Sequence, residues 1–208
     1  MSERIGIVGT GSDGAALLLE AVLGRGARGA GVVAPPHPMY GGRLDNPVVS
    51  AIADGLEQAG IAPLRFNFQG IGASDGVASA DATQADADFR AAFKHLASLR
   101  TPPYVGAGYS FGAATALRVA ARGAAVAQLI LLSPPLFLLD QTSLRSFAGP
   151  IAIVVGDEDQ YLPLAELEQA VAGLANVRLR VLANVDHFYG DADFEELAWL
   201  IAATANEV

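Results

Sequence analysis

The sequence contains no cysteine among its 208 residues. This absence excludes disulfides, thiolate nucleophiles and cysteine-ligated metal sites together. Long hydrophobic runs are also missing, because no stretch reaches roughly 18 uncharged apolar residues. The segment Val126–Leu139, for example, is interrupted by Gln128 and by Ser133-Pro134-Pro135. The N-terminal residues Met1–Gly6 lack the basic segment and unbroken apolar stretch of a signal peptide. We therefore expect a soluble, cytoplasmic protein.

Positive charge is scarce as well. Lys and Arg total 13 against 22 Asp and Glu, which gives a net charge of −9. A surface of this sign repels nucleic-acid phosphates and anionic lipids, so we expect neither nucleic acid nor a membrane as a partner. A hydrophobic content of 52% with only 17% charged residues is typical of an α/β protein with a buried parallel sheet. The length fits a single domain over residues 1–208, and nothing in the sequence indicates an oligomeric state.

Strand-like and helix-like segments alternate along most of the chain. Short apolar or period-two segments predict strands near residues 29–36, 64–68, 104–108, 126–132, 151–155 and 177–182. Helical patterns follow near residues 47–59, 81–100, 111–122, 165–174 and 191–204. This alternation predicts an α/β fold with a mostly parallel twisted sheet, helices on both faces and an N-terminal antiparallel hairpin.

A glycine-rich segment near the N-terminus, Gly9–Gly14, matches the G-x-G-x-x-G pattern of dinucleotide-binding folds. That interpretation needs a helix next, which Ala15–Leu23 can provide, and an acidic residue about 20 positions further on. The expected position falls in Val32–Pro36, which has no acid. The competing interpretation is a hairpin whose turn contains Asp13-Gly14. We favour the hairpin and assign no cofactor to this segment.

A candidate nucleophile lies in the segment Gly108-Tyr109-Ser110-Phe111-Gly112, a G-x-S-x-G pattern between a predicted strand and a predicted helix. The pattern also arises by chance in a chain with 23 glycines. Here, however, the flanking strand and small-residue helix supply the context that it requires. A serine on such a tight turn presents its hydroxyl beside the free N–H groups at the helix start. Ser110 is therefore the candidate nucleophile.

A serine nucleophile needs a base, and the chain has three histidines. His37 precedes the serine motif, and His95 lies off the apolar stripe of its predicted helix, where we expect it to face solvent. His187 follows the last predicted strand and is the candidate base. His37, Ser110 and His187 all come just after predicted strands. Because parallel strands end at the same edge of a sheet, we expect these residues to gather there.

The base needs a carboxylate partner, which is expected in the loop after the strand at residues 151–155. Asp157, Glu158 and Asp159 lie in this loop, and Asp186 neighbours the histidine. Consecutive side chains in extended backbone point to opposite sides, which disfavours Asp186 and Glu158. The alternation of side-chain direction does not distinguish the remaining two residues, Asp157 and Asp159, because both point to the same side. Position favours Asp159, which lies further into the loop, and we expect Asp157 to support that loop through local backbone hydrogen bonds.

Taken together, these segments resemble the α/β-hydrolase superfamily, and more closely a compact, lidless bacterial branch of it. The resemblance rests on His37-Pro-x-Tyr-Gly-Gly42, Arg65–Gly76, the Ser110 motif, Gly156-x-x-Asp159-x-x-x-Pro163 and Asp186-His187-Phe188. These segments extend over nearly the whole chain. Two residues depart from the branch: Pro36 stands where it often repeats His-Pro, and Gln69 stands where it often has Arg.

The resemblance implies a serine hydrolase that cleaves small carboxyl-ester-type substrates through an acyl-enzyme on Ser110, with His187 as base and Asp159 as acid. No metal or organic cofactor is implied. The connection Pro134–Pro150 is too short for a helical lid, so short, soluble esters are expected. The alternative is a non-catalytic binding protein with the same fold.

The resemblance also implies an oxyanion hole made by two backbone N–H groups. One belongs to Phe111, directly after the nucleophile. The second comes from the loop His37–Gly42, with Met39 as the expected donor and Tyr40 as the second choice. Pro38 has no N–H, and we expect His37 to brace this loop by hydrogen bonding.

Overall fold

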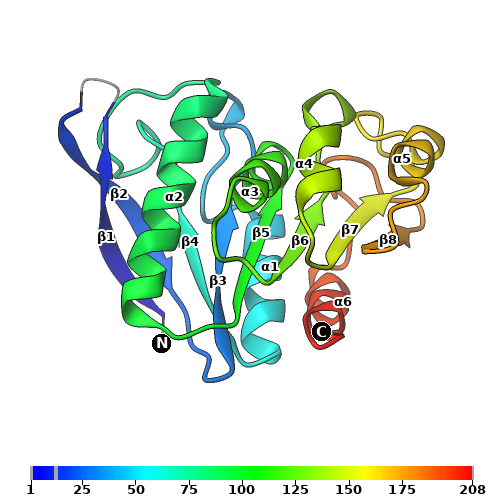
Figure 1. Cartoon of the computed structure of the whole chain (residues 1–208), viewed down its shortest axis with the longest axis horizontal. Helices are drawn as coiled ribbons and strands as arrows, with labels where there is room; N and C mark the ends of the chain where they lie inside the picture. The colour runs from blue at the N-terminus through cyan, green and yellow to red at the C-terminus, as the bar shows by residue number, and fades with distance from the viewer. Residues whose placement is uncertain (1, 12–13, 208) are drawn as a thin grey trace.

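The computed structural model describes residues 2–11 and 14–207. Within these residues, eight strands form one sheet in the order β1-β2-β4-β3-β5-β6-β7-β8 (Figure 1). The strands are β1 Glu3–Thr10, β2 Ala16–Leu23, β3 Gly29–Ala34, β4 Ile61–Phe66, β5 Tyr104–Tyr109, β6 Gln128–Leu132, β7 Ile151–Gly156 and β8 Val177–Leu182. The helices are α1 Pro47–Gln58, α2 Ala82–Leu99, α3 Phe111–Ala121, α4 Gln141–Ser146, α5 Leu164–Val171 and α6 Phe194–Ala205, with 3₁₀ turns η1 Pro38–Tyr40 and η2 Leu136–Leu138.

The N-terminal hairpin is confirmed. Strands β1 and β2 pair antiparallel from Glu3 opposite Leu23 to Thr10 opposite Ala16, and β2 continues antiparallel onto β4. The remaining neighbours are parallel. Residues 16–23 are therefore a strand and not the helix of a dinucleotide site. In the predicted turn, Gly14 has a φ of 82° and donates its N–H to the Gly11 carbonyl, whereas Asp13 lies outside the described residues.

Helices cover both faces of the sheet, as the alternation predicts (Figure 1). The apolar residues of α2 and α3, such as Phe89 and Leu117, belong to one buried core. Those of α1 and α6, such as Ile52 and Ile201, belong to a second core on the other face. The central strands β3, β5, β6 and β7 lie between these layers, which explains why they are buried along their whole length.

Most helix starts follow from their capping residues. The Asn46 side chain accepts a hydrogen bond from the Val48 N–H at the start of α1, and Asp81 accepts one from the Thr83 N–H at the start of α2. Strand β4 differs from prediction: it begins at Ile61, which pairs with Gly29 of β3, and ends at Phe66. Directly after it, the Asn67 side chain accepts the Leu44 N–H at 2.7 Å.

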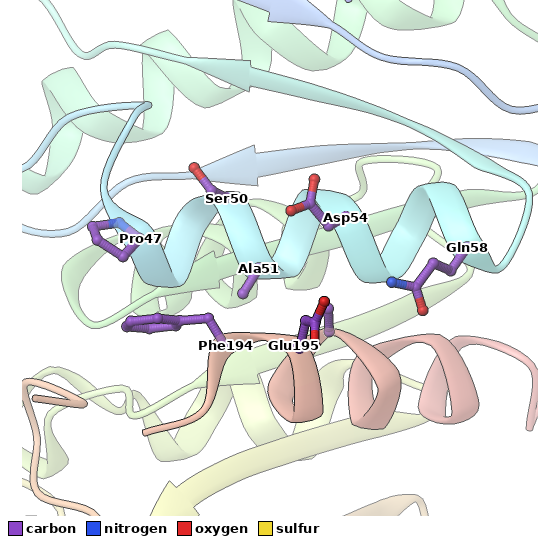
Figure 2. Close-up of a pocket in the computed structure, with 8 residues that line it drawn as sticks. Pro47, Ser50, Ala51, Asp54, Gln58, Phe194 and Glu195 are labelled. Atoms are coloured by element: carbon purple, nitrogen blue, oxygen red, sulfur yellow. The ribbon is translucent and has the colours of Figure 1, made fainter. Parts of the chain in front are cut away.

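Helices α1 and α6 run side by side on one face, and Gly55 permits their close approach. A Cβ at Gly55 would come within 2.5 Å of the Ala198 carbonyl oxygen. Beside this contact the two helices enclose a hollow of about 460 Å³, shown in Figure 2. Its lining residues are Pro47, Ser50, Ala51, Asp54, Gln58, Phe194, Glu195 and Ala198. None of the described helices is long and apolar enough to cross a bilayer.

Candidate active site

Ser110 stands on a tight turn between β5 and α3, with a φ of 54°. Glycine is required two positions before Ser110 and two positions after it. A Cβ at Gly108 would lie 2.6 Å from the Gly112 carbonyl carbon, and a Cβ at Gly112 would lie 2.4 Å from the Ala34 carbonyl oxygen. The Ser110 N–H donates to the Leu132 carbonyl at 2.8 Å, which ties the turn to the end of β6. The sequence therefore holds the serine in a strained conformation by close backbone packing.

The structure brings together the three side chains that the sequence selects. The Ser110 Oγ lies 3.0 Å from His187 Nε2, and His187 Nδ1 lies 2.9 Å from Asp159 Oδ1. All three residues are buried, although they come from the ends of β5, β7 and β8. A hydroxyl, an imidazole and a carboxylate in this order form the arrangement that deprotonates a serine during nucleophilic attack.

Asp159 is held in its charged form. Burial alone raises the pKa of its carboxyl group, but hydrogen bonds from His187, Ser133 and the Tyr161 N–H outweigh burial and hold the pKa below its ordinary value. The Tyr161 and Leu162 N–H groups donate to Oδ1 at 2.9 Å and 3.0 Å. The carboxylate is therefore preset to accept a hydrogen bond from the imidazole and to stabilise a positive charge on it.

The other acidic residues in the loops after β7 and β8 do not contact the His187 ring through any hydrogen bond between described residues. Asp157 Oδ1 accepts the Asn184 N–H at 2.7 Å, which fixes the start of the loop that carries His187. Asp186 Oδ1 accepts the Phe188 N–H at 3.0 Å within its own turn. Glu158 is exposed. The structure thus resolves the choice that alternation leaves open: Asp159, and not Asp157, lies against the imidazole.

Three buried hydroxyl residues behind these side chains were missed by sequence reasoning. The Tyr109 hydroxyl donates to the His187 carbonyl at 2.7 Å, and the Ser133 hydroxyl lies 3.1 Å from that of Tyr189. Burial raises the pKa of both tyrosines, so their hydroxyls remain protonated. Ser133 follows β6 at the same sheet edge as Ser110, and that position was the available signal for it.

The loop before α1 contains both N–H groups considered for the second oxyanion donor. The Met39 N–H, the expected second oxyanion donor, is already used: it donates to His37 Nδ1 at 3.2 Å. The Tyr40 N–H, the second choice, donates to the His37 carbonyl at 3.1 Å. His37 therefore braces the loop as expected, and this bracing is what occupies both N–H groups.

A cavity of about 750 Å³ opens above the serine. Its lining residues are Pro36, His37, Tyr40, Gly41, Gly42, Asn46, Ala80, Tyr109, Ser110, Phe111, Pro135, Phe137, Leu138, Tyr161, His187 and Phe188. It shares no lining residue with the hollow between α1 and α6. His95 lies on α2, is partly buried and does not line it. The turn η2 provides part of the wall, and α4 is the one further helix in the connection that a lid would occupy.

Known proteins share this architecture. An α/β serine hydrolase homologue from Coxiella burnetii is 29% identical, covers 97% of this chain and 96% of its own, and superposes with a TM-score of 0.82. A serine hydrolase without a lid from Xanthomonas campestris, XC6422, is 25% identical, with 98% and 94% coverage and a TM-score of 0.82. An uncharacterized protein of Rickettsia prowazekii, RP471, is 26% identical in an alignment of 169 positions that covers 76% of this chain and 71% of that protein.

The family described as serine aminopeptidase, S33, matches residues 47–155, just over half of the chain. The match begins at α1, contains Ser110 and ends at β7. The fold of the whole chain agrees with that of the solved relatives, one of which is described as lacking a lid. The protein is therefore a hydrolase of the α/β-hydrolase superfamily and belongs to the serine aminopeptidase S33 family.

Proposed function

We propose that this protein is a carboxylesterase-like serine hydrolase that cleaves small esters through an acyl-enzyme on Ser110. The observation that carries the proposal is the unbroken hydrogen-bonded series from Ser110 Oγ through His187 to Asp159, with distances of 3.0 Å and 2.9 Å. It reaches the floor of a cavity large enough for a small ester.

In the proposed reaction, His187 Nε2 takes the Ser110 proton as Oγ attacks the ester carbonyl. The tetrahedral intermediate collapses when the C–O bond to the alcohol breaks, and His187 returns the proton to the departing alkoxide. Water then attacks the acyl-serine, with His187 again as base, and releases the carboxylic acid and free Ser110. Asp159 stabilises the imidazolium that forms in each half-reaction.

The Phe111 N–H is the first proposed donor to the oxyanion. It lies at the first position of α3 and has no acceptor within its own helix. For the second donor we propose His37. Met39 and Tyr40 use their N–H groups inside the loop, and prolines at positions 36 and 38 have none. The His37 N–H is the donor in none of the hydrogen bonds among the described residues.

The position of His37 supports this choice, because its ring contacts Phe111 with centroids 4.9 Å apart. The two proposed donors therefore come from residues that touch each other and that line the same cavity as Ser110. Each such donor contributes roughly 2.7–4 kcal/mol of transition-state stabilisation in a serine hydrolase.

Ester cleavage fits the cavity better than the aminopeptidase activity that the family's description suggests. An aminopeptidase must bind the positively charged amino terminus of its substrate, for which a carboxylate is the usual partner. The lining residues include neither Asp nor Glu. Asp159 itself lies behind His187 and is already hydrogen-bonded to it. We therefore expect hydrolysis of p-nitrophenyl esters but not of amino-acid p-nitroanilides.

A fluorophosphonate probe tests the proposal directly. Native protein should be labelled at Ser110, whereas heat-denatured protein and Ser110→Ala should not be. A panel of p-nitrophenyl esters of increasing chain length should show turnover that Ser110→Ala abolishes. If native protein is neither labelled nor active on any of these esters, the alternative of a non-catalytic binding protein is favoured.

A further inference from the structure

Four aromatic side chains that line the cavity are left largely exposed. Tyr40 is 88% exposed, Phe137 76%, Phe188 61% and Tyr161 44%. They come from four separate segments: η1, η2, the loop after β7 and the loop after β8. Leaving four rings in water forgoes a large hydrophobic gain, and exposed apolar groups gathered around one cavity mark a ligand site. We call these four residues the aromatic rim.

The rings are arranged in two groups around the serine. His187, Tyr161 and Phe188 stand nearly at right angles to one another, with interplanar angles of 69°, 89° and 90°. In the second group, the His37 ring lies 4.7 Å from Tyr40 and 4.9 Å from Phe111. Ser110 links them, since its hydroxyl contacts His187 and its neighbour is Phe111. Edge-to-face contacts of this kind leave ring faces open to a planar group.

The cavity also lacks a fixed charge. Its lining residues include no Asp, Glu, Lys or Arg, and its two ionisable side chains besides tyrosine are His37 and His187. Burial lowers the pKa of His37. Its Nδ1 accepts the Met39 N–H, so the neutral ring carries its proton on Nε2. Nothing in the lining is therefore placed to pair with a charged substrate, and burying an unpaired charge is costly.

We propose that the substrate is a neutral ester that carries an aromatic ring within reach of its carbonyl, and that the aromatic rim binds this ring. The proposal rests on the proposed ester hydrolysis and adds the substrate class. Aromatic pairs contribute beyond simple burial of area, by an amount that corresponds to about 2- to 12-fold in kcat/KM for each good contact. A phenyl group should therefore be preferred over a saturated ring of the same shape.

Matched substrates separate this effect from hydrophobicity. Methyl 3-phenylpropanoate is compared with methyl 3-cyclohexylpropanoate, and 2-phenylethyl acetate with 2-cyclohexylethyl acetate. Two methylenes insulate each ring from the ester, so the intrinsic reactivities within a pair match. A merely apolar cavity favours cyclohexyl, which has more apolar surface. We expect kcat/KM to favour the phenyl member by about 3- to 10-fold in at least one pair. The absence of a phenyl preference in both pairs overturns the proposal.

Substitutions in the aromatic rim test whether these residues cause the preference for phenyl over cyclohexyl. Phe137→Leu and Tyr40→Leu keep an apolar side chain but remove a ring, and each should lower the phenyl-to-cyclohexyl ratio by about 2-fold or more. Trp199→Leu is the control, because Trp199 is 71% exposed on α6 and does not line the cavity. It should leave both the ratio and the rates unchanged. If the ratio survives both rim substitutions, the aromatic rim does not bind the ring and the proposal fails.

Charge is tested with monomethyl glutarate against its neutral isostere, methyl 5-methylhexanoate. We expect the anion to be cleaved at least about 10-fold more slowly, since no cation lines the cavity. Equal rates would overturn the assignment to neutral esters. Methyl butanoate and fluorophosphonate labelling distinguish the two levels of proposal. Labelled, active protein without ring preference refutes only the substrate class, whereas unlabelled and wholly inactive protein refutes the proposed function and this proposal with it.

Discussion

The hydroxyl oxygens of Ser133 and Tyr189 lie 3.1 Å apart, although 56 positions separate the two residues in the chain. Both are buried and both have a positive φ, 43° for Ser133 and 58° for Tyr189. The other non-glycine residues of this kind in the described chain are Ser110 and Asn184. All four lie at the proposed active site or in the loop that carries His187. Backbone strain is therefore concentrated in and around the proposed active site.

Ser133 should support catalysis through Asp159. Its hydrogen bond lowers the pKa of the Asp159 carboxyl group, so its loss leaves a buried carboxylate less well stabilised. We expect Ser133→Gly to reduce kcat by about 10-fold, with a smaller change in KM. Glycine is the informative substitution because it removes the hydroxyl while tolerating the positive φ. Tyr189→Phe, which keeps Ser133 in place, should cost less. Unchanged kcat in Ser133→Gly would show that the hydroxyl is only structural.

The two aspartates of the loop after β7 should behave differently. Asp159→Asn removes the charge beside the imidazole and favours the wrong histidine tautomer, so kcat should fall by roughly 10⁴-fold. Asp157→Asn disturbs only the hydrogen bond to the Asn184 N–H and should retain much of the activity. Both variants are compared by ester hydrolysis, with circular dichroism to show that each is folded. An exchange of these outcomes would make Asp157 the acid, against the geometry.

His187 should be essential for ester hydrolysis. Its imidazole takes the Ser110 proton in the proposed reaction, and without it the hydroxyl remains a weak nucleophile. His187→Ala should lose most activity with the fold intact. His95→Ala is the matched control, since His95 lies on α2 away from the cavity. Comparable losses in the two variants would contradict the assignment of the base.

Stability should depend on pH through Asp88, a buried residue of α2. Its carboxylate accepts hydrogen bonds from Gln69 N–H and Nε2 at 3.0 Å and 2.6 Å. Burial nevertheless raises the pKa of Asp88 to about 6. The folded protein thus keeps this proton to a higher pH than the unfolded chain, and stability falls as the pH rises from about 4 to 6, by roughly 3 kcal/mol in all.

The Asp88→Asn variant stays neutral, so its Tm should no longer decline over this pH range. Thermal unfolding between pH 4 and 7 measures the difference. Asp54→Asn, at an exposed position on α1, is the control and should keep the wild-type pH dependence. A decline of the same size in Asp88→Asn would assign the effect to another group.

Sequence reasoning reached the fold and the three side chains that the structure brings together, because local rules decide both. Gly108 and Gly112 mark a turn that few other residues can form, and the positions of Ser110 and His187 follow from strands that end at one edge. Asp159 needed one further argument, from its position in the loop.

The remaining features depend on contacts between distant segments. The Ser133–Tyr189 contact joins the end of β6 to the loop beyond β8. No periodic pattern in the sequence predicts this contact. The hydrogen bond from the Met39 N–H to His37 is of the same kind, because the direction of this N–H depends on the turn around His37, which the spacing of residues does not define. Gln69 shows the same limit: its partner Asp88 is 19 positions away.

The separation of the aromatic rim from the sheet has an evolutionary consequence. The turn at Ser110 is locked by backbone contacts that tolerate almost no substitution, whereas Tyr40, Phe137 and Phe188 project from connecting segments and are largely exposed. Their side chains can change without disturbing the packing that positions Ser110. Substrate preference in such a scaffold is free to diverge quickly between descendants, and random libraries confined to these few positions should yield new selectivities while most members still fold.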